Sequence, residues 1–353
     1  MLYLCAIEWE WIAQRPHFLE MELEKHFEIT VASPVHVLKK IKKQRNTRVP
    51  DSFFTFNLYP YQERVGFLAA QSKRVFRKRA GDINAYDILW LGSPLFIKYV
   101  PEDYKGMVIY DYMDDTISMQ TSEVLIKAYT DQHNRLCERA DIIFASSNYL
   151  MNLLPEGAKS KARLLRNAFR GEQLIPPAQS GVSETIRLGY VGTISSWMDW
   201  KTILQSLENI PNLEYHFWGP SDGETPQNEK IFYHGVVEHS KIADEIKDMD
   251  ALLMPFVVND IIKAVDPVKL YEYISYGKTV ISVGYDEVQR FADFVWLYYS
   301  SEEYMNILKL LGEGKLESKY DEASQKEFLE NNTWKHRAEQ AHEDIANTYE
   351  LRG

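Results

Sequence analysis

Cysteine is scarce in this chain of 353 residues, which holds only Cys5 and Cys137, neither at metal-ligand spacing. This scarcity excludes a disulfide framework and a cysteine-based zinc site, and it predicts a reducing, cytoplasmic location. No run approaches the 18 apolar residues that a membrane-spanning helix needs. The first residues, MLYLCAIEWEW, lack a basic n-region, so we expect no secretory signal.

Several catalytic motifs are also missing. The chain contains neither G-x-x-x-x-G-K-[ST] nor G-x-G-x-x-G, which argues against ATP hydrolysis and against a standard NAD site. It has no G-x-S-x-G and no Cys/His pairing that would indicate nucleophilic catalysis. No internal repeat with a period of 20–50 residues is present.

Charge is distributed unevenly. Residues 1–185 carry a net charge of +2 and residues 186–353 a net charge of −13. Within the first half, residues 38–80 hold 12 basic residues and two acidic ones. This stretch is either a solvated helical face or a patch for an anionic membrane surface or acceptor. The acidic second half argues against nucleic acid as the partner.

Short apolar segments alternate with amphipathic ones, a pattern that predicts βα units and parallel sheets. Helices are expected near 16–26, 66–79 and 121–138. The expected strands of the first half are 2–7, 28–33, 53–58, 87–92, 107–112, 141–146 and 162–167. Those of the second half are 186–192, 213–219, 230–236, 251–257, 279–284 and 295–300.

The proline pair and small polar residues of GEQLIPPAQSGVSET interrupt this pattern. We therefore predict an N-terminal Rossmann-like domain (1–170), a linker (171–185), a C-terminal Rossmann-like domain (186–330) and a helix (331–353) that packs toward the first domain. The fold class is α/β, with two doubly wound domains facing a central cleft. Ligands of such sheets bind at the carboxyl ends of the strands.

The segment AVDPVKLYEYISYGKTVIS (264–282) combines several helix signals. Asp266 is a good N-cap, Pro267 a good first helical residue, and Gly277 suits the left-handed position after the helix. Leu270 and Ile274 should face the sheet, while Glu272 should share the opposite side with Val268 and Ser275. Lys269 and Glu272 form either a solvated pair or a site for a phosphorylated ligand, since a cation in the first turn is unfavourable without a bound anion.

The run P-x-K-x-x-E-Y followed by G-K-x-V-I resembles the signature of family 4 retaining glycosyltransferases of the GT-B fold. The similarity is to bacterial members acting on cell-surface polysaccharides, including those of teichuronic-acid type. Further stretches match in the expected order along nearly the whole chain: RPHFL (15–19), VIYDYMDD (108–115), ADIIFASSNYL (140–150), LLRNAF (164–169), LGYVGTISSWMDW (188–200) and TWKHRAEQ (333–340).

The resemblance implies a nucleotide-sugar donor held mainly by the second domain. Glu272 would bind the donor ribose and Lys269 would lie near the diphosphate. Gly192 and Thr193 would line the phosphate pocket. The loop of Gly235, Val236 and Val237 would run beside the base.

The chain departs from the family pattern at two places. The first Glu of the E-x7-E pair is replaced by Ala264, so its contact with the donor sugar is vacant or passes to Asn259, Asp260 or Asp266. The Arg and Lys that many members carry after the first strand of the second domain are also missing. Lys269, Lys263, Arg15 or the helix N-terminus must then meet the diphosphate charge.

In the first domain, Arg15 and His17 follow the first strand, where they either touch phosphate and acceptor or support the helix. Asp111, Asp114 and Asp115 end another strand, and Asp114 could orient the acceptor or serve as a cap. These carboxylates could hold Mg²⁺, but no partner acid motif appears and GT-B enzymes generally work without a bound metal. We therefore expect no metal and no cofactor.

The predicted function is hexosyltransferase-like transfer, with retention, from a UDP- or GDP-sugar to a glycan or lipid-linked acceptor in cell-surface polysaccharide synthesis. Two alternatives stay open: a GT-B sugar-nucleotide epimerase and a non-catalytic two-lobed sugar-binding protein. The predicted location is cytoplasmic, with peripheral contact at the inner face of the membrane through residues 38–80. The donor sugar, base, acceptor and linkage are not predicted.

Overall fold

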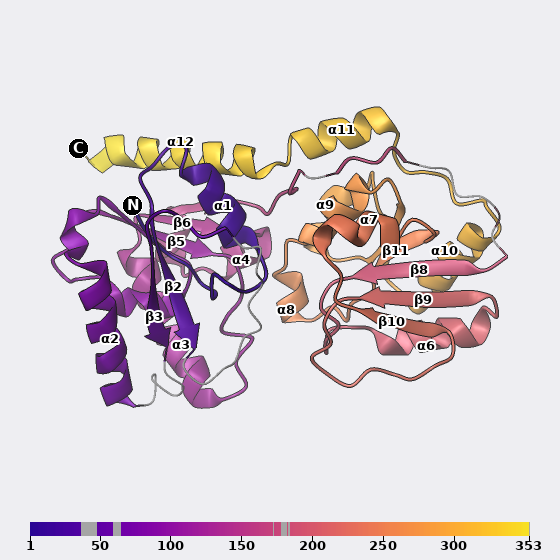
Figure 1. The fold of residues 1–353 in the computed structure, drawn as a ribbon, viewed down its shortest axis with the longest axis horizontal. Coiled ribbons are helices and arrows are strands. Elements are labelled where there is room, and N and C mark those ends of the chain that lie inside the picture. Colours follow the sequence, from indigo (N-terminus) through magenta and orange to yellow (C-terminus); the bar gives the residue numbers. More distant parts are fainter. Residues whose placement is uncertain (37–47, 59–64, 172, 178–181, 183, 353) are drawn as a thin grey trace. The chain divides into compact units, whose positions relative to one another are not determined.

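The computed structural model describes residues 1–36, 48–58, 65–171, 173–177, 182 and 184–352. The chain forms two compact units, residues 1–167 with 334–353, and residues 168–333. Each unit contains one parallel sheet covered by helices, as Figure 1 shows. None of the helices in these described ranges combines the length and apolarity that a membrane crossing requires.

The sheet of the first unit has seven strands in the order β3-β2-β1-β4-β5-β6-β7, and all its pairs are parallel. This order reverses beside β1, as in a doubly wound sheet. The strands are β1 (Leu2–Leu4), β2 (Thr30–His36), β3 (Phe53–Leu58), β4 (Ile88–Leu91), β5 (Met107–Tyr112), β6 (Ile142–Ala145) and β7 (Ala162–Leu164).

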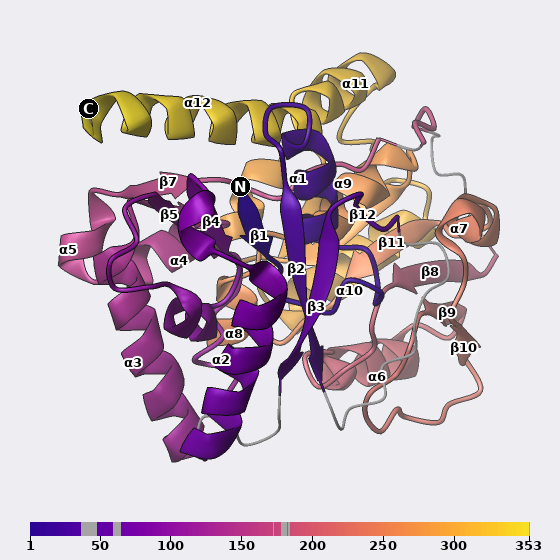
Figure 2. The ribbon, with the colours of Figure 1, turned by 60° about the vertical axis from the view of Figure 1, so that its left-hand side comes forward.

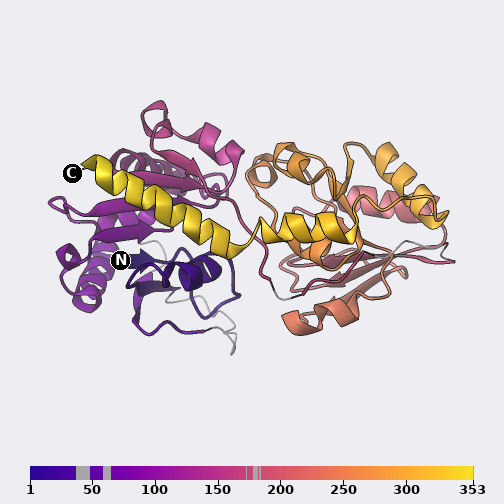
Figure 3. The same cartoon turned by 90° about the horizontal axis from the view of Figure 1, so that it is seen from above.

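Helices cover both faces of this sheet (Figure 2). They are α1 (Arg15–Leu23), α2 (Gly66–Ala80), α3 (Glu123–Arg139), α4 (Asn148–Leu153), α5 (Glu156–Lys159) and α12 (Trp334–Arg352), with 3-10 turns η1 (Ile83–Ala85) and η2 (Pro94–Tyr99). The last helix, α12, returns to this unit and lies along α1 (Figure 3). The stacked rings of Phe18 and Trp334, 5.7 Å apart, join the two helices.

The sheet of the second unit has six parallel strands in the order β10-β9-β8-β11-β12-β13. The strands are β8 (Ile186–Val191), β9 (Leu213–Trp218), β10 (Ile231–Gly235), β11 (Ala251–Met254), β12 (Thr279–Val283) and β13 (Trp296–Tyr298). The helices are α6 (Trp200–Asn209), α7 (Ile242–Glu245), α8 (Asp260–Lys263), α9 (Val268–Ser275), α10 (Ser301–Gly312) and α11 (Glu322–Glu330), with 3-10 turns η3 (His239–Lys241) and η4 (Asp286–Phe291).

The strand predictions are confirmed, because every predicted apolar segment overlaps one strand of the described residues. Central strands such as β5, β6 and β11 are buried along their whole length, which explains their continuous apolar sequences. The structure divides the chain after Asn167 and after Thr333. It therefore assigns α12 to the first unit and α11 to the second.

Candidate functional site

The start of α9 differs by one residue from the prediction. The helix begins at Val268 with Pro267 as its N-cap, so Asp266 does not cap it. The Asp266 carboxylate is buried and forms an ion pair with Arg290, which also donates to the Tyr271 hydroxyl. A buried carboxylate needs a charged partner, and the Arg290 guanidinium satisfies that need better than one backbone N–H.

The end of α9 agrees with the prediction. Gly277 has φ +63°, the left-handed conformation expected after the helix. A side chain at this position would lie 2.4 Å from the carbonyl oxygens of Ile175 and Pro176. Glycine is therefore needed for the turn and for the close approach of the chain at 175–176.

The faces of α9 decide which side chains can meet a ligand. Leu270 and Ile274 are fully buried, as predicted for the side that faces the sheet. Ser275, predicted on the same side as Glu272, is also buried, so only part of that side is open to solvent. The helix packs on more than one side, and its half-buried side chains are those of Val268, Lys269 and Glu272.

Lys269 reaches the end of β8. A Cβ atom built on Gly192 would lie 2.2 Å from Lys269 Cε and 2.7 Å from its Nζ, so the lysine occupies the space that glycine leaves. The ammonium also lies 5.8 Å from the centre of the Tyr190 ring. Within the described residues no carboxylate pairs with Lys269. Lys269 and Glu272 therefore do not form the solvated ion pair that was one of the two predicted alternatives.

Tyr273 fixes the distance between α9 and β8. Its hydroxyl accepts a hydrogen bond from the Val191 N–H at 2.8 Å and donates to the Val191 carbonyl at 3.2 Å. Lys269 and Tyr273 stand one turn apart on the same side of the helix. The end of β8 is thus held by one residue of α9 and covered by another.

Two glycines open a backbone cradle under the Lys269 ammonium. Gly192 has φ +149° and Gly219, after β9, has φ +141°. A Cβ atom on Gly219 would lie 2.0 Å from the Gly192 carbonyl oxygen, so the two strand ends touch. The carbonyl of Thr193 accepts a hydrogen bond from the Tyr190 hydroxyl at 2.8 Å. These residues lie at the carboxyl end of β8, beside the point where the strand order reverses.

Glu272 lies one turn further along α9, and His239 of η3 contacts it. His239 Nε2 is 3.4 Å from Glu272 Oε1, and both side chains are part exposed. Gly235 ends β10, and Val236 and Val237 follow it in the loop to η3, where Val236 is 66% exposed. The structure therefore brings the predicted base loop and the predicted ribose carboxylate to one edge of the sheet.

The predicted substitutes for the missing Glu have other contacts. Ala264 is buried at the end of α8. Asn259 caps α8 by accepting the Ile262 N–H at 3.0 Å, and Asp260 pairs with Lys263 at 3.0 Å on the surface. With Asp266 buried against Arg290, its predicted contact with the donor is not supported by the geometry, and Asn259 and Asp260 are the side chains nearer to solvent.

In the first unit, Arg15 forms a buried ion pair. Its guanidinium lies 2.8 Å from Asp111 Oδ1 and donates to the Leu165 carbonyl at 2.8 Å and to Asn167 Oδ1 at 3.3 Å. Arg15 is 5% exposed. The structural alternative for Arg15 therefore fits the geometry, and its charge is already neutralised by Asp111.

His17 is buried at the start of α1. Its Nδ1 accepts the Gln14 N–H at 3.1 Å, and its Nε2 lies 2.8 Å from the Trp9 carbonyl, to which it donates. Burial lowers the pKa of His17. With both ring nitrogens occupied and the neutral form favoured, His17 has a capping role in this structure rather than the predicted exchange of protons.

Asp114 differs from its two neighbours. Asp111 pairs with Arg15, and Asp115 is buried and accepts from the Ser118 hydroxyl and N–H. No donor bonds to the Asp114 carboxyl in the described part of the chain. Burial raises the pKa of Asp114 to about 7, against the lowering effect of Arg15. Asp114 is thus a half-buried acid at the carboxyl edge of the first sheet that can gain or lose a proton near neutral pH.

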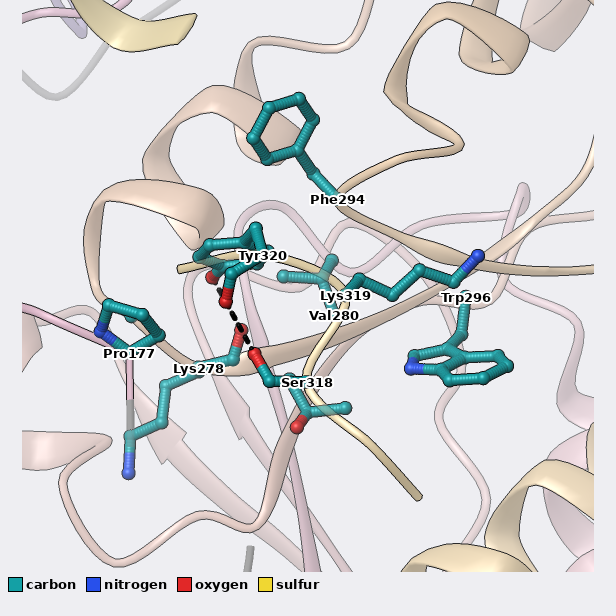
Figure 4. Close-up of a pocket in the computed structure, with 10 residues that line it drawn as sticks. Pro177, Lys278, Val280, Phe294, Trp296, Ser318, Lys319 and Tyr320 are labelled. Atoms are coloured by element: carbon teal, nitrogen blue, oxygen red, sulfur yellow. Dashed lines mark hydrogen bonds between the residues drawn. The ribbon is translucent and has the colours of Figure 1, made fainter. Parts of the chain in front are cut away.

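A hollow of the second unit lies at the other edge of its sheet (Figure 4). Thr279 and Trp296, which open β12 and β13, line it. Tyr320 donates to the Lys278 carbonyl at 3.0 Å across its floor. Ligands of parallel sheets bind at the opposite edge, so we do not assign the donor to this hollow. Among the described residues, no cluster of three or more His, Cys, Asp or Glu is placed to hold a metal ion.

No family model matches the chain. In sequence it is 24% identical over 297 residues to "Putative teichuronic acid biosynthesis glycosyltransferase TuaH" of Bacillus subtilis, covering 77% of this chain and 71% of that protein.

Two solved structures are similar in fold. The lipopolysaccharide outer core galactosyltransferase WaaB, in its apo form, aligns with a TM-score of 0.67 at 12% identity over 100% of this chain and 99% of its own. HepE of Anabaena, in complex with UDP and glucose, aligns with a TM-score of 0.69 at 12% identity over 98% and 99%.

The two parallel sheets and these similarities agree with one another. They confirm the predicted resemblance and the prediction of an enzyme that transfers glycosyl groups. The chain therefore has the GT-B fold and is related to glycosyltransferases.

Proposed function

We propose that this chain transfers a sugar from a nucleotide-sugar donor to a glycan or lipid-linked acceptor in cell-surface polysaccharide synthesis. The observation that carries the donor site is the Lys269 ammonium, which stands over Gly192 with no carboxylate paired to it in the described residues. A diphosphate bound there would meet this ammonium and the N-terminal end of α9.

Glu272 supports a nucleotide rather than a simple phosphate. Its carboxylate lies one turn beyond Lys269 on the same helix and is part exposed. A carboxylate at that position accepts hydrogen bonds from the vicinal hydroxyls of a ribose. The segment of Gly235, Val236 and Val237, whose first two residues are exposed, would then run beside the base.

The chemistry proposed is departure of the nucleoside diphosphate with retention of configuration at the sugar. Lys269 and the start of α9 stabilise the negative charge that develops on the leaving group, which is the usual form of electrostatic catalysis. A front-face reaction requires no protein nucleophile, and neither a metal nor a cofactor enters the proposal. Asp114 of the first unit would orient the acceptor hydroxyl and take its proton.

We also propose a cytoplasmic location with peripheral contact to an anionic membrane through the basic stretch 38–80. Residues 38–47 and 59–64 of this stretch lie outside the described residues. The described part includes β3 and α2, and the last turn of α2 carries Arg77, Lys78 and Arg79. Phe67, in the first turn of α2, is 75% exposed. A basic helix with an exposed aromatic residue is typical of membrane-surface contact.

Incubation with a panel of UDP- and GDP-sugars tests the reaction. The proposal predicts that at least one donor raises the melting temperature and slowly releases its nucleoside diphosphate to water. Interconversion of one nucleotide sugar into another would favour the epimerase. Binding of free sugars without turnover would favour the sugar-binding protein, and both results would contradict sugar transfer.

The Glu272→Ala variant ties the activity to this site. Loss of hydrogen bonds to a charged acceptor weakens binding by roughly 1.5–3 kcal/mol, so donor affinity should fall about 10- to 100-fold. Glu330→Ala, which removes an exposed acid at the end of α11, is the matched control and should bind as the unchanged protein does. Unchanged donor affinity in Glu272→Ala would contradict the proposed contact between Glu272 and the ribose.

A further inference from the structure

We infer that His239 is a positioning residue for the ribose of the donor. This inference rests on the proposed function, and it assigns a role to a side chain that lies outside the sequence motifs. His239 Nε2 lies 3.4 Å from Glu272 Oε1, at the long end of a hydrogen bond. His239 is the side chain seen beside the Glu272 carboxylate, although 33 positions separate the two residues.

The contact comes from two different elements. Glu272 is the fifth residue of α9. His239 is the first residue of η3, which follows the segment 235–237. Nothing in local sequence spacing brings the two together. The base loop and the ribose carboxylate are therefore tied to one another through this polar contact.

The chemistry of the pair explains what the contact does. A glutamate side chain on a helix surface has several rotamers, and holding it in one conformation costs side-chain entropy. When Nε2 donates to Oε1, the carboxylate is held in one orientation before the donor arrives. Oε2 then stays available for the hydroxyls of the ribose, and preorganisation of this kind raises affinity.

The exposure of the pair leaves room for a ligand. The side chain of His239 is 30% exposed and that of Glu272 is 23% exposed. They are neither sealed in the core nor extended into solvent. The Glu272 carboxylate is therefore held by protein and still accessible to a small ligand.

The inference predicts that His239 governs the distinction between ribose and deoxyribose. In the unchanged protein, UDP or GDP should bind about tenfold tighter than the matching 2′-deoxy nucleotide, because the 2′-hydroxyl donates to the carboxylate. In His239→Ala this preference should fall to about threefold or less. Affinity for inorganic pyrophosphate, which meets Lys269 and Gly192, should change by less than twofold.

Two further variants separate positioning from a general structural role. The amide nitrogen of His239→Gln can reach the place of Nε2 and should restore most of the preference for ribose. Lys241→Ala removes a side chain of the same 3-10 turn that pairs with Glu238 and not with Glu272, so it should keep the full preference. Circular dichroism of each variant checks that the fold is retained.

The possible results separate this inference from the proposed function. If the unchanged protein binds nucleoside diphosphates but His239→Ala keeps the full ribose preference, the role of His239 is wrong and the donor site stands. If the unchanged protein binds no nucleoside diphosphate, the donor site and the role of His239 both fail. If His239→Ala and Lys241→Ala lose the preference equally, the turn is only structural and the positioning role is overturned.

Discussion

Single residues of the second unit set the position of positive charge at the candidate donor site. Lys269 stands in the first turn of α9, where the helix dipole disfavours a cation. Its ammonium occupies the space above Gly192, which only a residue without a side chain provides. The Lys269 ammonium is therefore in an unfavourable electrostatic environment until an anionic ligand binds beside it.

Replacing Gly192 by alanine should disturb both the backbone and the lysine. The φ of +149° is strained for alanine, and the new Cβ would lie 2.2 Å from Lys269 Cε. We expect a loss of about 1–3 kcal/mol in unfolding free energy from the backbone and weaker donor binding from the displaced ammonium. Gly223→Ala, with no heavy atom within 4 Å of its added Cβ, is the control. Equal effects of the two variants in denaturation and titration experiments would contradict this account.

Asp114 makes the stability of the first unit depend on pH. Burial raises the pKa of Asp114 to about 7, above its ordinary value of 3.8. The folded state therefore keeps a proton that the unfolded chain loses, and stability falls as the pH rises toward 7 and levels off above it. Asp114→Asn removes the titrating group, so this part of the loss of unfolding free energy with rising pH should disappear.

The stabilising effect of Asp114→Asn should be about 1 kcal/mol larger at pH 8 than at pH 6, since one pH unit corresponds to about 1.4 kcal/mol. Urea denaturation at the two pH values measures it. Asp103→Asn, at an exposed acid of the same unit, should give no such difference. Equal stabilisation at the two pH values would show that Asp114 is already ionised when folded at pH 6.

At the scale of elements, α9 and the end of β8 form one assembly. The Tyr273 hydroxyl bonds to both the N–H and the carbonyl of Val191, the residue before Gly192. Asp266 and Arg290 hold the other end of the helix. The distance from Lys269 to the cradle is thus set by packing of the helix against the strand rather than by the lysine alone.

Tyr273→Phe should loosen this assembly. The substitution leaves the Val191 N–H without its partner, which costs about 1–3 kcal/mol in unfolding free energy, and donor affinity should fall several-fold. Tyr320→Phe removes a hydroxyl that donates to the Lys278 carbonyl at the opposite edge of the sheet and to the Ile274 carbonyl near the C-terminal end of α9, away from Lys269. It should lower stability without changing donor affinity. If Tyr273→Phe also left donor affinity unchanged, the assembly would not position Lys269.

The elements differ in how far sequence predicts them. Buried parallel strands are short apolar runs between turns, so all the strands of the described residues could be located from sequence. The start of α9 could not, because the partner of Asp266 is Arg290, 24 positions away. The burial of Ser275 could not be predicted for the same reason, because it depends on packing against residues outside the helix.

The candidate site shows the same limit. Gly192, Lys269 and Glu272 could be predicted because they occur in a motif, and the structure gathers them at one edge. His239 and Tyr273 act through contacts with Glu272 and Val191 that no local spacing reveals. Arg15 and His17 occur at a promising strand end, but their side chains point into the unit and are satisfied there.

At the scale of the whole molecule, the two units differ in charge. The basic stretch 38–80 includes α2, and the second half of the chain carries a net charge of −13. A membrane with anionic lipids would attract the first and repel the second. The first unit is therefore the one expected to contact such a surface.

Binding to vesicles containing phosphatidylserine tests the proposed membrane contact. Replacing five basic residues of α2 by glutamine should weaken binding more than tenfold, because each contributes about 1 kcal/mol near an anionic surface. These residues are Lys73, Arg74, Arg77, Lys78 and Arg79. Five exposed lysines of the second unit, replaced in the same way, serve as the control: Lys201, Lys241, Lys247, Lys315 and Lys326. Equal binding of the α2 variant and the unchanged protein would show that the basic residues of α2 form a solvated face and do not contact the membrane.

The donor site itself is tested most directly by calorimetric titration of UDP and GDP into the unchanged protein and into Lys269→Met. Lys315→Met, at an exposed lysine, is the control. We predict that one of the two nucleotides binds the unchanged protein and the control equally, and binds Lys269→Met about tenfold or more weakly, since a lost charge-assisted contact costs more than about 1.4 kcal/mol. Equal affinity for Lys269→Met, or no binding of either nucleotide to the unchanged protein, would contradict the assignment of the donor to the edge formed by α9 and β8.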